Sequence, residues 1–373
     1  MALPTTNIFL RSPYIIEKSV AELDYVKVNL KIWNGLLSDE PSEVTIKLRS
    51  TALEDYVSID IAEFARDYVE VTFAGTVDSS AVFISYQMAW VTQSGIETPD
   101  PKVYLIGFDG YSSFQEGVNF QFYNDVLMSS NTVTAYEDQS THIPVLTGHL
   151  TGWDLYKYGS ADVPTYIFYT GTVTPTATLP DSSISTQDLV RYVSTGSGNV
   201  FADRVVFHFD NAPDETVDVN YVNCNKYGNT KLYFVNKYGT IQEMHLSGRF
   251  DVGVKTESSD FKRNLMVNGS YSTTRHQRST LNKNGIITME LNSGWYSQED
   301  NDTFLEMIMS EQVWIDVEVA RLGLGWLPKQ APYYTIPVTC TSSDMQLKNK
   351  INHKLINYTF KFEAAHDWIN TVR

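Results

Sequence analysis

Carboxylates are plentiful in this sequence, with 44 aspartates and glutamates, and one acidic loop gathers four of them. The segment DNAPDETVD contains Asp210, Asp214, Glu215 and Asp218. Oxygen ligands at short spacing are what calcium prefers in proteins. However, the loop lacks the glycine and the ligand spacing of a known calcium loop. An ordinary solvated acidic loop is therefore the better interpretation.

Histidine and cysteine are the other residue types that hold metal ions or act as nucleophiles. The seven histidines are scattered without the spacing of metal ligands: His142, His149, His208, His245, His276, His353 and His366. Cys224 and Cys340 lie 116 residues apart and neither belongs to a CxxC pair, which argues against a zinc knuckle or a disulfide scaffold. This cysteine usage fits a reducing compartment, and the sequence predicts no metal and no other cofactor.

Sequence motifs of catalysis are absent from the chain. It contains no Walker loop, no GxGxxG fingerprint, no GxSxG elbow and no HExxH helix. Two carboxylates could still meet in space as the acid and the nucleophile of a glycosidase, but the sequence gives no separation between them. We therefore expect a non-enzymatic protein and keep a cell-wall hydrolase or glycosidase as an alternative.

Aromatic side chains are numerous, with 23 tyrosines, 18 phenylalanines and 7 tryptophans. This composition favours β structure. Exposed indole rings could also stack on sugars, and the candidates for such binding are Trp153, Trp295 and Trp326. The competing interpretation places these rings in the core, where aromatic side chains contribute most of their energy.

Charge is unevenly distributed over the 373 residues, whose formal net charge is −16. Residues 1–210 contain 11 lysines and arginines against 26 aspartates and glutamates, whereas residues 211–373 contain 17 against 18. Phosphate contacts supply most nucleic-acid affinity, so the acidic front part predicts no sequence-specific nucleic-acid partner. No run of 18 apolar residues occurs, which predicts no membrane span.

A basic stretch lies between Arg249 and Lys283. Its cationic residues are Arg249, Lys255, Lys262, Arg263, Arg275, Arg278 and Lys283, and its acidic residues are Asp251, Glu257 and Asp260. One interpretation is a solvated loop, because charge runs usually lie in solvent. The other is an arm that contacts an acidic surface, such as the acidic front part of a neighbouring copy. In that case the candidate subunit contacts are Arg263, Arg275, Arg278 and Lys283.

The first expected domain, residues 1–98, has the pattern of a β-sandwich-like domain. Apolar and polar side chains alternate over residues 26–32, 44–48 and 82–90. Such alternation is typical of strands with one buried face. A short helix is expected after Asp60, which could cap it. Its expected apolar stripe consists of Ile61, Phe64, Ala65 and Tyr68.

An irregular β region is expected over residues 99–215, after a boundary marked by Pro99 and Pro101. It should begin with a strand, a tight turn at Asp109-Gly110 and a second strand. The segment GTVTPTATLPDSSIST, rich in Thr, Ser and Pro, is expected to be an extended loop.

Residues 216–373 predict an α+β domain with one helix near 298–310. Acidic residues near the start of that helix suit its dipole, and Phe304, Met307 and Ile308 should form its buried stripe. The predicted fold class is thus mainly β, multi-domain, with β-sandwich-like modules and a few short helices.

The tetrad Asn-Lys-Tyr-Gly occurs twice, at 225–228 and 236–239, on either side of the apolar run Leu-Tyr-Phe-Val. Asn and Gly tolerate a positive φ, which tight turns require. The repeat therefore predicts two turns that flank one strand, rather than two ligand-binding repeats.

Several stretches resemble structural proteins of tailed, crAss-like phages of Bacteroidetes. The start RSPYIIEKS…KVNLKIWNG and the run VSIDIAEFARDYV carry the resemblance at Arg11, Ser12, Pro13, Trp33, Asn34, Gly35, Arg66, Asp67 and Tyr68. The segments FDGYSSFQEGVN, KLYFVNKYGTIQEMHLSGR, IPVTCTSSD and NYTFKFEAA extend it over the whole length of the chain.

The resemblance implies a virion structural protein, namely a ring or hub subunit of the neck or tail that is present in several symmetric copies. Such a subunit is made in the host cytoplasm, connects adjacent virion components and lines or surrounds the DNA path. Its implied partners are copies of itself and neighbouring portal, ring or tail proteins, and no catalytic residue is carried over. A receptor- or glycan-binding tail protein is the alternative.

Overall fold

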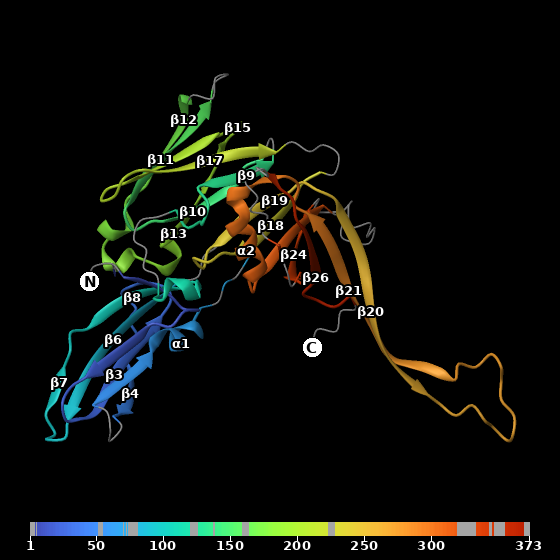
Figure 1. Ribbon diagram of the computed structural model, residues 1–373, viewed down its shortest axis with the longest axis horizontal. Coiled ribbons are helices and arrows are strands. Elements are labelled where there is room, and N and C mark those ends of the chain that lie inside the picture. Colours follow the sequence, from blue (N-terminus) through green and yellow to red (C-terminus); the bar gives the residue numbers. More distant parts are fainter. Residues whose placement is uncertain are drawn as a thin grey trace. The chain divides into compact units, whose positions relative to one another are not determined.

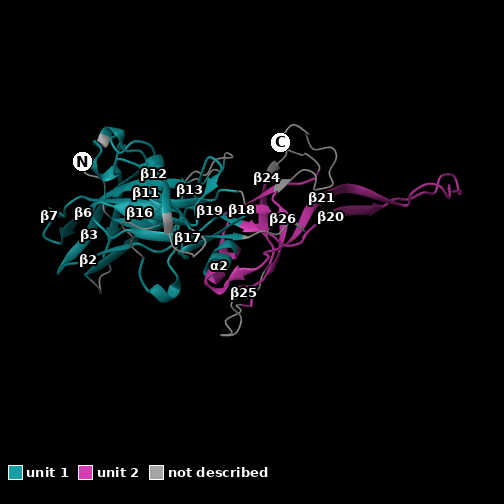
Figure 2. Ribbon diagram, turned by 90° about the horizontal axis from the view of Figure 1, so that it is seen from above, with its two compact units in different colours: residues 1–222, 234–244, 302–307 teal, residues 223–233, 245–301, 308–373 magenta. Residues whose placement is uncertain are grey.

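The computed structural model describes all residues except 1–3, 5, 51–54, 70, 72, 74–80, 120–125, 137–138, 159–163, 223–227, 319–332, 343–344, 347–354 and 369–373. The protein is mainly β, with 54% strand and 10% helix among the described residues, which confirms the predicted class of a multi-domain protein with β-sandwich-like modules and a few short helices. Two compact units are present (Figure 2). Unit 1 contains Met1–Val222, Phe234–Met244 and Asp302–Met307, and unit 2 contains Asn223–Tyr233, His245–Asn301 and Ile308–Arg373. The domain boundaries expected after residues 98 and 215 stay predictions.

The first sheet of unit 1 has six strands in the order β1-β8-β6-β3-β4, with β7 paired to β6 (Figure 1). These strands are β1 (Asn7–Phe9), β3 (Leu23–Trp33), β4 (Val44–Arg49), β6 (Ala81–Thr92), β7 (Glu97–Pro99) and β8 (Val103–Phe108). Val26, Val28 and Leu30 of β3 are buried, whereas the residues between them are partly exposed. The predicted alternation in this strand is confirmed.

Two layers pack on opposite faces of this sheet. Ile84 of β6 belongs to a core cluster with Ile16 and Val57, which lie on a separate two-stranded ladder. Its neighbour Phe83 belongs to a second cluster with Leu146. Because both faces of β6 are covered, its first six residues are all buried. The ladder consists of β2 (Ile15–Ser19) and β5 (Tyr56–Asp60).

Helix α1 (Ile61–Arg66) follows β5 directly. Asp60 caps it by accepting a hydrogen bond from the backbone N–H of Ala62, as predicted. The predicted apolar stripe is wrong in part. Ile61 and Ala65 are buried, but Phe64 and Tyr68 are exposed, because only the side of this short helix at Ile61, Ala62 and Ala65 packs on the core.

The second part of unit 1 contains a five-stranded sheet in the order β12-β11-β16-β17-β9 and two small ladders, β10-β13 and β14-β15. Their bounds are β9 (Thr132–Tyr136), β10 (His142–Leu146), β11 (Leu150–Tyr158), β12 (Pro164–Thr172), β13 (Val190–Ser194), β14 (Gly196–Ser197), β15 (Val200–Phe201), β16 (Arg204–Phe209) and β17 (Glu215–Val222). The Thr- and Pro-rich segment after β12 contains the 3-10 turns η2 (Thr176–Thr178), η3 (Asp181–Ser183) and η4 (Thr186–Asp188).

A seven-stranded sheet in the order β19-β18-β23-β24-β26-β21-β20 provides most of unit 2, and the division between the units passes through β18 and β19. The strands are β18 (Thr230–Val235), β19 (Ile241–Leu246), β20 (Phe250–Lys262), β21 (Arg278–Asn292), β23 (Val313–Glu318), β24 (Tyr333–Cys340) and β26 (Thr359–Ala364). A small ladder joins β22 (Tyr296–Ser297) to β25 (Leu355–Ile356). The aromatic face predicted for β26 is confirmed, since Phe360 and Phe362 are buried.

The helix predicted near residues 298–310 is present as α2 (Asn301–Met309), preceded by the 3-10 turn η5 (Gln298–Asp300). Ser297 caps this turn through a side-chain hydrogen bond from the N–H of Glu299. Phe304 and Met307 are buried, as predicted, whereas Ile308, the third residue of the predicted stripe, is only half-buried.

The second Asn-Lys-Tyr-Gly tetrad forms the turn between β18 and β19, as predicted. Gly239 has φ +76°, and a Cβ built on it would lie 2.7 Å from the backbone of Asp109, so only glycine fits. The buried Asn236 side chain accepts hydrogen bonds from the N–H groups of Tyr238 and Thr240, which holds the turn closed. Residues 225–227 of the first tetrad lie outside the described residues.

Candidate assembly surface

The basic stretch forms a long β-hairpin that extends away from the rest of the unit 2 sheet (Figure 1). β20 and β21 pair antiparallel from Phe250↔Leu291 to Lys262↔Arg278. β21 pairs with β26 only over Thr288–Asn292. Residues 256–284, called the hairpin arm below, therefore form a two-stranded ribbon with the connecting loop at its end, and no residue of the arm is buried. The interpretation as a solvated loop is corrected, because most of the stretch is paired strand.

Local turn chemistry explains why the chain reverses at the end of the hairpin arm. Asn268 and Gly269 have φ values of 51° and 79°, the left-handed conformation that a two-residue hairpin turn needs. Val267 and Ser270 exchange backbone hydrogen bonds of 2.9 and 3.1 Å across this turn. The Asn-Gly dipeptide therefore fixes the tip of the arm.

Positive charge is concentrated in the outer part of the hairpin arm. Residues 261–283 contain no aspartate or glutamate. Their cations are Lys262, Arg263, Arg275, Arg278 and Lys283. All five residues are exposed, and within the described part of the chain none of them forms an ion pair. Unpaired cations on one projecting ribbon create a positive potential that favours an acidic partner.

Large apolar side chains accompany these cations and were missed by the sequence-based prediction. The exposed ones are Phe261, Met266, Val267, Tyr271 and Leu281. Leu281 is 75% exposed, and none of the described residues forms a second layer over the ribbon. Clustered exposed apolar residues mark interaction sites more often than single ones do. The signal in the sequence was the mixture of Leu, Met, Val and Tyr with arginines in a segment without carboxylates.

The structure places all four predicted contacts, Arg263, Arg275, Arg278 and Lys283, on this arm. Arg263 also donates from Nε to the backbone carbonyl of His276, which ties the two sides of the connecting loop together. Their role as subunit contacts stays a prediction, and the geometry makes them available for it.

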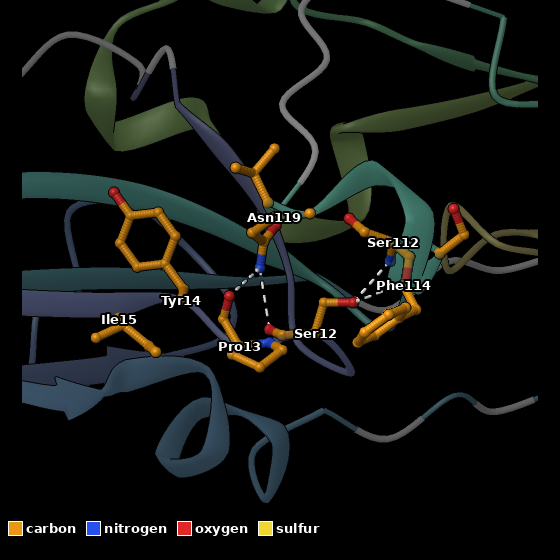
Figure 3. A pocket seen from close by; sticks show the side chains of 10 residues that line it. Ser12, Pro13, Tyr14, Ile15, Ser112, Phe114 and Asn119 are labelled. Atoms are coloured by element: carbon orange, nitrogen blue, oxygen red, sulfur yellow. Dashed lines mark hydrogen bonds between the residues drawn. The ribbon is translucent and has the colours of Figure 1, made fainter.

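A pocket in unit 1 brings together two segments that carry the phage resemblance (Figure 3). Its volume is about 580 Å³. The lining residues are Ser12, Pro13, Tyr14, Ile15, Ser112, Ser113, Phe114, Gly117, Val118 and Asn119, and we call it the Phe114 pocket. No lining residue is charged, and Phe114 at its rim is fully exposed.

Side-chain hydrogen bonds hold the two segments of the Phe114 pocket in place. Asn119 accepts from the N–H of Phe9 at 2.9 Å and donates to the carbonyls of Phe9 and Ser12 at 2.8 and 3.0 Å. Ser12 Oγ also accepts from the N–H of Ser112 at 2.7 Å. These bonds replace the predicted second strand: β8 ends at Phe108, and a loop with the 3-10 turn η1 (Phe114–Glu116) follows. That part of the sequence-based prediction is wrong for residues 111–119.

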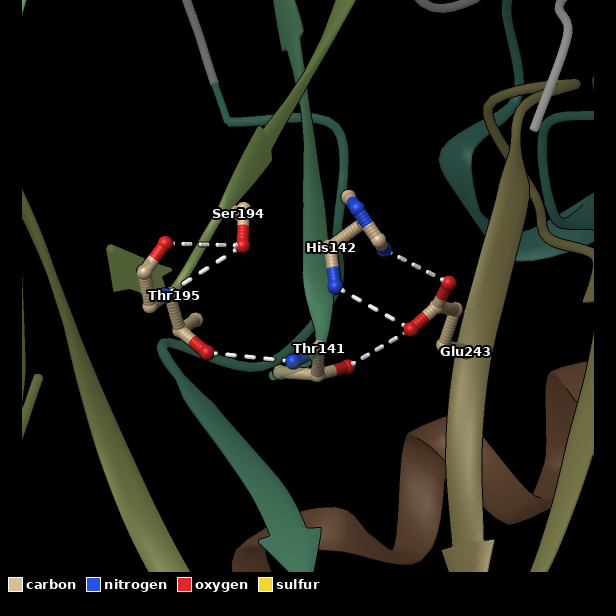
Figure 4. Close-up of polar contacts among 6 residues, drawn as sticks. Thr141, His142, Ser194, Thr195 and Glu243 are labelled. Atoms are coloured by element: carbon tan, nitrogen blue, oxygen red, sulfur yellow. Dashed lines mark hydrogen bonds and ion pairs between the residues drawn. The ribbon is translucent and has the colours of Figure 1, made fainter. Parts of the chain in front are cut away.

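Glu243 is the centre of a buried polar cluster in unit 1 (Figure 4). Its carboxylate accepts from the hydroxyl of Thr141 at 3.2 Å, the N–H of His142 at 3.1 Å and the His142 ring at 2.8 Å. In a Ser-His-Asp triad the hydroxyl bonds to the ring nitrogen that faces away from the carboxylate. Here the hydroxyl bonds to the carboxylate itself, so the cluster ties β19 to β10 rather than activating a nucleophile.

Glu306 of α2 is a second buried carboxylate in unit 1. Burial raises its pKa, although hydrogen bonds from the hydroxyl of Ser129 and the N–H of Lys237 favour the charged form. Both carboxylate oxygens of Glu306 therefore accept hydrogen bonds from other residues of unit 1. The arrangement fixes the helix against the 236–240 turn and leaves no free acid for catalysis at this position.

The acidic loop is not assembled into a cation site. Asp210 pairs with His149, Asp214 with His208, and Asp218 with Arg204. No group of three or more potential metal ligands occurs among the described residues. The carboxylates of this loop are thus directed at different partners in the five-stranded sheet.

The three candidate sugar-stacking tryptophans have different environments. Trp153 belongs to the core of unit 1, with the Arg191 guanidinium over its ring at 5.0 Å, so it is not available to a ligand. Trp295 is 64% exposed. Trp326 lies outside the described residues, as does Cys224. Within the described residues, no helix is both long and apolar enough to cross a bilayer.

Comparisons with known proteins give no family. No family model and no curated protein matches the chain. Among solved structures, the fibronectin(III)-like modules of Clostridium thermocellum CbhA align over 61% of this chain and 94% of that chain, at 10% identity and a TM-score of 0.16. Extracellular domains 3–5 of Drosophila OTK align over 78% of this chain and 90% of that chain, at 10% identity and a TM-score of 0.20. Scores this low do not establish a common fold.

Proposed function

We propose that this chain is a non-enzymatic structural subunit that assembles with copies of itself, as a ring or hub subunit in the neck or tail of a tailed phage. The hairpin arm is the single observation that carries the proposal. It is an exposed ribbon with five cations that form no ion pair among the described residues, and it displays large apolar side chains.

The energetics of the hairpin arm support an intermolecular role. A two-stranded ribbon without a packing layer is marginally stable in water. In the isolated chain the Leu281 side chain stays 75% exposed, so folding covers little of its apolar surface. Such a side chain would gain about 25 cal/mol for each Å² of apolar surface that a partner covers. The arm therefore has a physical reason to be in contact with another protein.

The distribution of charge supports a neighbouring copy as that partner. A closed ring uses heterologous contacts, in which one face of each subunit meets a different face of the next. The cationic arm and residues 1–210, which have a large excess of aspartate and glutamate, carry net charges of opposite sign. The resemblance described above favours a virion as the setting of this assembly, where portal, ring or tail proteins would be the further neighbours. An acidic surface near the channel would also let DNA pass without binding.

Charge reversal in the arm tests this function. The variant R275E/R278E should raise the protein concentration needed for half-assembly by about tenfold or more, because interface charges of the wrong sign repel. The matched control K47E/R49E reverses two exposed cations on the edge strand β4 and should assemble normally. Assembly is measured by light scattering after size-exclusion chromatography and by electron microscopy. An unchanged ring yield of R275E/R278E would contradict the proposal.

Glycan or receptor binding is a second candidate function, favoured by the exposed indole of Trp295. Stacking on a sugar uses such a ring. A glycan array with the purified protein, compared with the Trp295→Ala variant, tests it. Binding that Trp295→Ala abolishes would support this function, and an array without binding would remove it.

A further inference from the structure

The exposed rim of the Phe114 pocket is apolar on both sides. Phe114 and Val118 project from the η1 loop, and Ile15 projects from the start of β2; all three are exposed. Figure 3 shows the Ile15 and Phe114 side chains on opposite sides of the residues that line the pocket. The hollow is uncharged, and docking of a partner would remove these apolar rim side chains from water.

Acidic residues adjoin this hollow on one side. Ile15 stands opposite Asp60 in the β2–β5 ladder, and Glu17 lies two residues further along the same exposed face. Helix α1 begins at the pocket, since the N–H of Ile61 donates to the carbonyl of Tyr14, and it carries the exposed Glu63.

Nearby cations are already engaged with other groups of unit 1. Lys18 forms an ion pair with Asp100 at 2.8 Å, and Lys237 pairs with Glu116 at 3.2 Å. The guanidinium of Arg11 lies over the ring of Tyr111. The side of the pocket at β2 and α1 therefore presents the exposed carboxylates of Glu17 and Glu63, and the exposed Arg66 lies in the last turn of α1.

We propose that the Phe114 pocket receives the tip of the hairpin arm of a second copy of this chain. The inference rests on the proposed function and names the docking site that the arm would use. The tip presents the complementary pattern: exposed Val267 and Tyr271 beside the turn, then Arg263 and Arg275, with no carboxylate from residue 261 to residue 283. Apolar side chains enter the hollow, and the arginines face the carboxylates of β2 and α1.

Size supports the same occupant. Pockets of roughly 300–1,000 Å³ enclose ligands as large as a few side chains. The tip of the arm is a two-residue turn at Asn268-Gly269, closed by the pair Val267 and Ser270, and paired strands lie about 4.8 Å apart. The pocket volume of about 580 Å³ thus suits the tip of a hairpin.

Photo-crosslinking of the full-length chain tests the contact directly. Phe114 is replaced by p-benzoylphenylalanine, a variant that keeps an exposed aromatic ring, and equal amounts of ¹⁵N-labelled and unlabelled protein are mixed, assembled and irradiated. Mass spectrometry should find crosslinks from position 114 to residues 261–283, with half of the crosslinked pairs containing one labelled and one unlabelled peptide. Crosslinks confined to one copy, crosslinks to other segments, or no crosslink would overturn the proposal.

Variants provide the second measurement. Phe114→Asp should raise the concentration for half-assembly about tenfold, as expected for loss of a central apolar contact. The control Ile96→Asp, at a residue that is 63% exposed in a different turn of unit 1, should leave it unchanged. On its own, the charge reversal E17K/E63K should weaken assembly. Combined with R275E/R278E in the same chain, it should restore assembly.

The outcomes separate this inference from the proposed function. If R275E/R278E blocks assembly while Phe114→Asp assembles normally, the arm contacts another surface and the pocket assignment is wrong. If R275E/R278E also assembles normally, the proposed function is wrong as well.

Discussion

Strands β3 and β20 have similar lengths, 11 and 13 residues, and each pairs antiparallel with a long neighbour, yet their environments are opposite. β3 buries alternate side chains in the core of unit 1. β20 is almost entirely exposed. Strand pairing alone therefore does not require a core. What distinguishes the two ladders is whether a second layer covers one face, and the uncovered ladder is the one suited to contacts with another molecule.

The largest expected difference between the two ladders concerns truncation of a leucine. Leu30→Ala in β3 should lower the free energy of unfolding by about 2–5 kcal/mol, because it leaves a cavity in the core. Leu281→Ala in the hairpin arm should change it by less than about 0.5 kcal/mol, since that side chain is exposed. Urea denaturation followed by circular dichroism measures both. Equal losses in the two variants would mean that the arm is packed against a core in the isolated chain.

Two glycines with positive φ give a smaller difference. Gly239→Ala and Gly269→Ala both force alanine into the left-handed conformation, which costs about 1–2 kcal/mol. Only Gly239 also has the backbone of Asp109 within 2.7 Å of the added Cβ, whereas Gly269 has open space. The close contact at Gly239 should therefore lower the free energy of unfolding of Gly239→Ala by a further amount of about 1–3 kcal/mol. Thermal unfolding should give a lower melting temperature for Gly239→Ala than for Gly269→Ala. A lower melting temperature for Gly269→Ala would contradict this expectation.

The smallest expected effect is a pH dependence of stability that arises at His208, in the five-stranded sheet of unit 1. Burial disfavours the charged form of His208, but hydrogen bonds and ion pairs with Asp214 and Asp154 outweigh it, so its pKa is raised above 6.5. Because the pKa of His208 is raised in the folded state, the charged imidazole adds to the free energy of unfolding. This stabilisation is fully present below pH 6.5 and is lost as pH rises through the folded-state pKa.

His208→Gln measures that contribution. Its melting temperature should fall below that of the unchanged protein near pH 6, and the gap should narrow by about pH 8.5 as the imidazole loses its proton. The control variant is His149→Gln, which makes the same side-chain change at another His–Asp pair. A gap of constant size across this pH range would show that the ion pairs of His208 do not contribute.

Much of the fold was predictable, because alternation and capping are local. Val26, Val28 and Leu30 follow the period of a strand, and Asp60 and Ser297 precede the helical segments that they cap. The errors came from tertiary contacts. Phe64 has the spacing of a buried helix residue but is exposed, since packing is supplied by the other side of α1.

The candidate surface was predictable in its charge but not in its shape. The arginines are visible in the sequence, whereas the apolar alternation of β20 stops at Val254, so nothing indicated that the strand continues to Lys262. The Phe114 pocket could not be predicted either. It depends on hydrogen bonds of Asn119 to Phe9 and Ser12, which are more than a hundred residues away in sequence.

Hydrogen exchange of the hairpin arm tests the central claim most directly. The exchange of backbone amides in residues 256–284 is compared at a concentration at which the protein is assembled and after dilution, with the amides of β3 as an internal control. We expect the arm to become protected only in the assembled protein, while β3 exchanges equally slowly in both samples. Arm amides that exchange at the same rate in the two samples would contradict it.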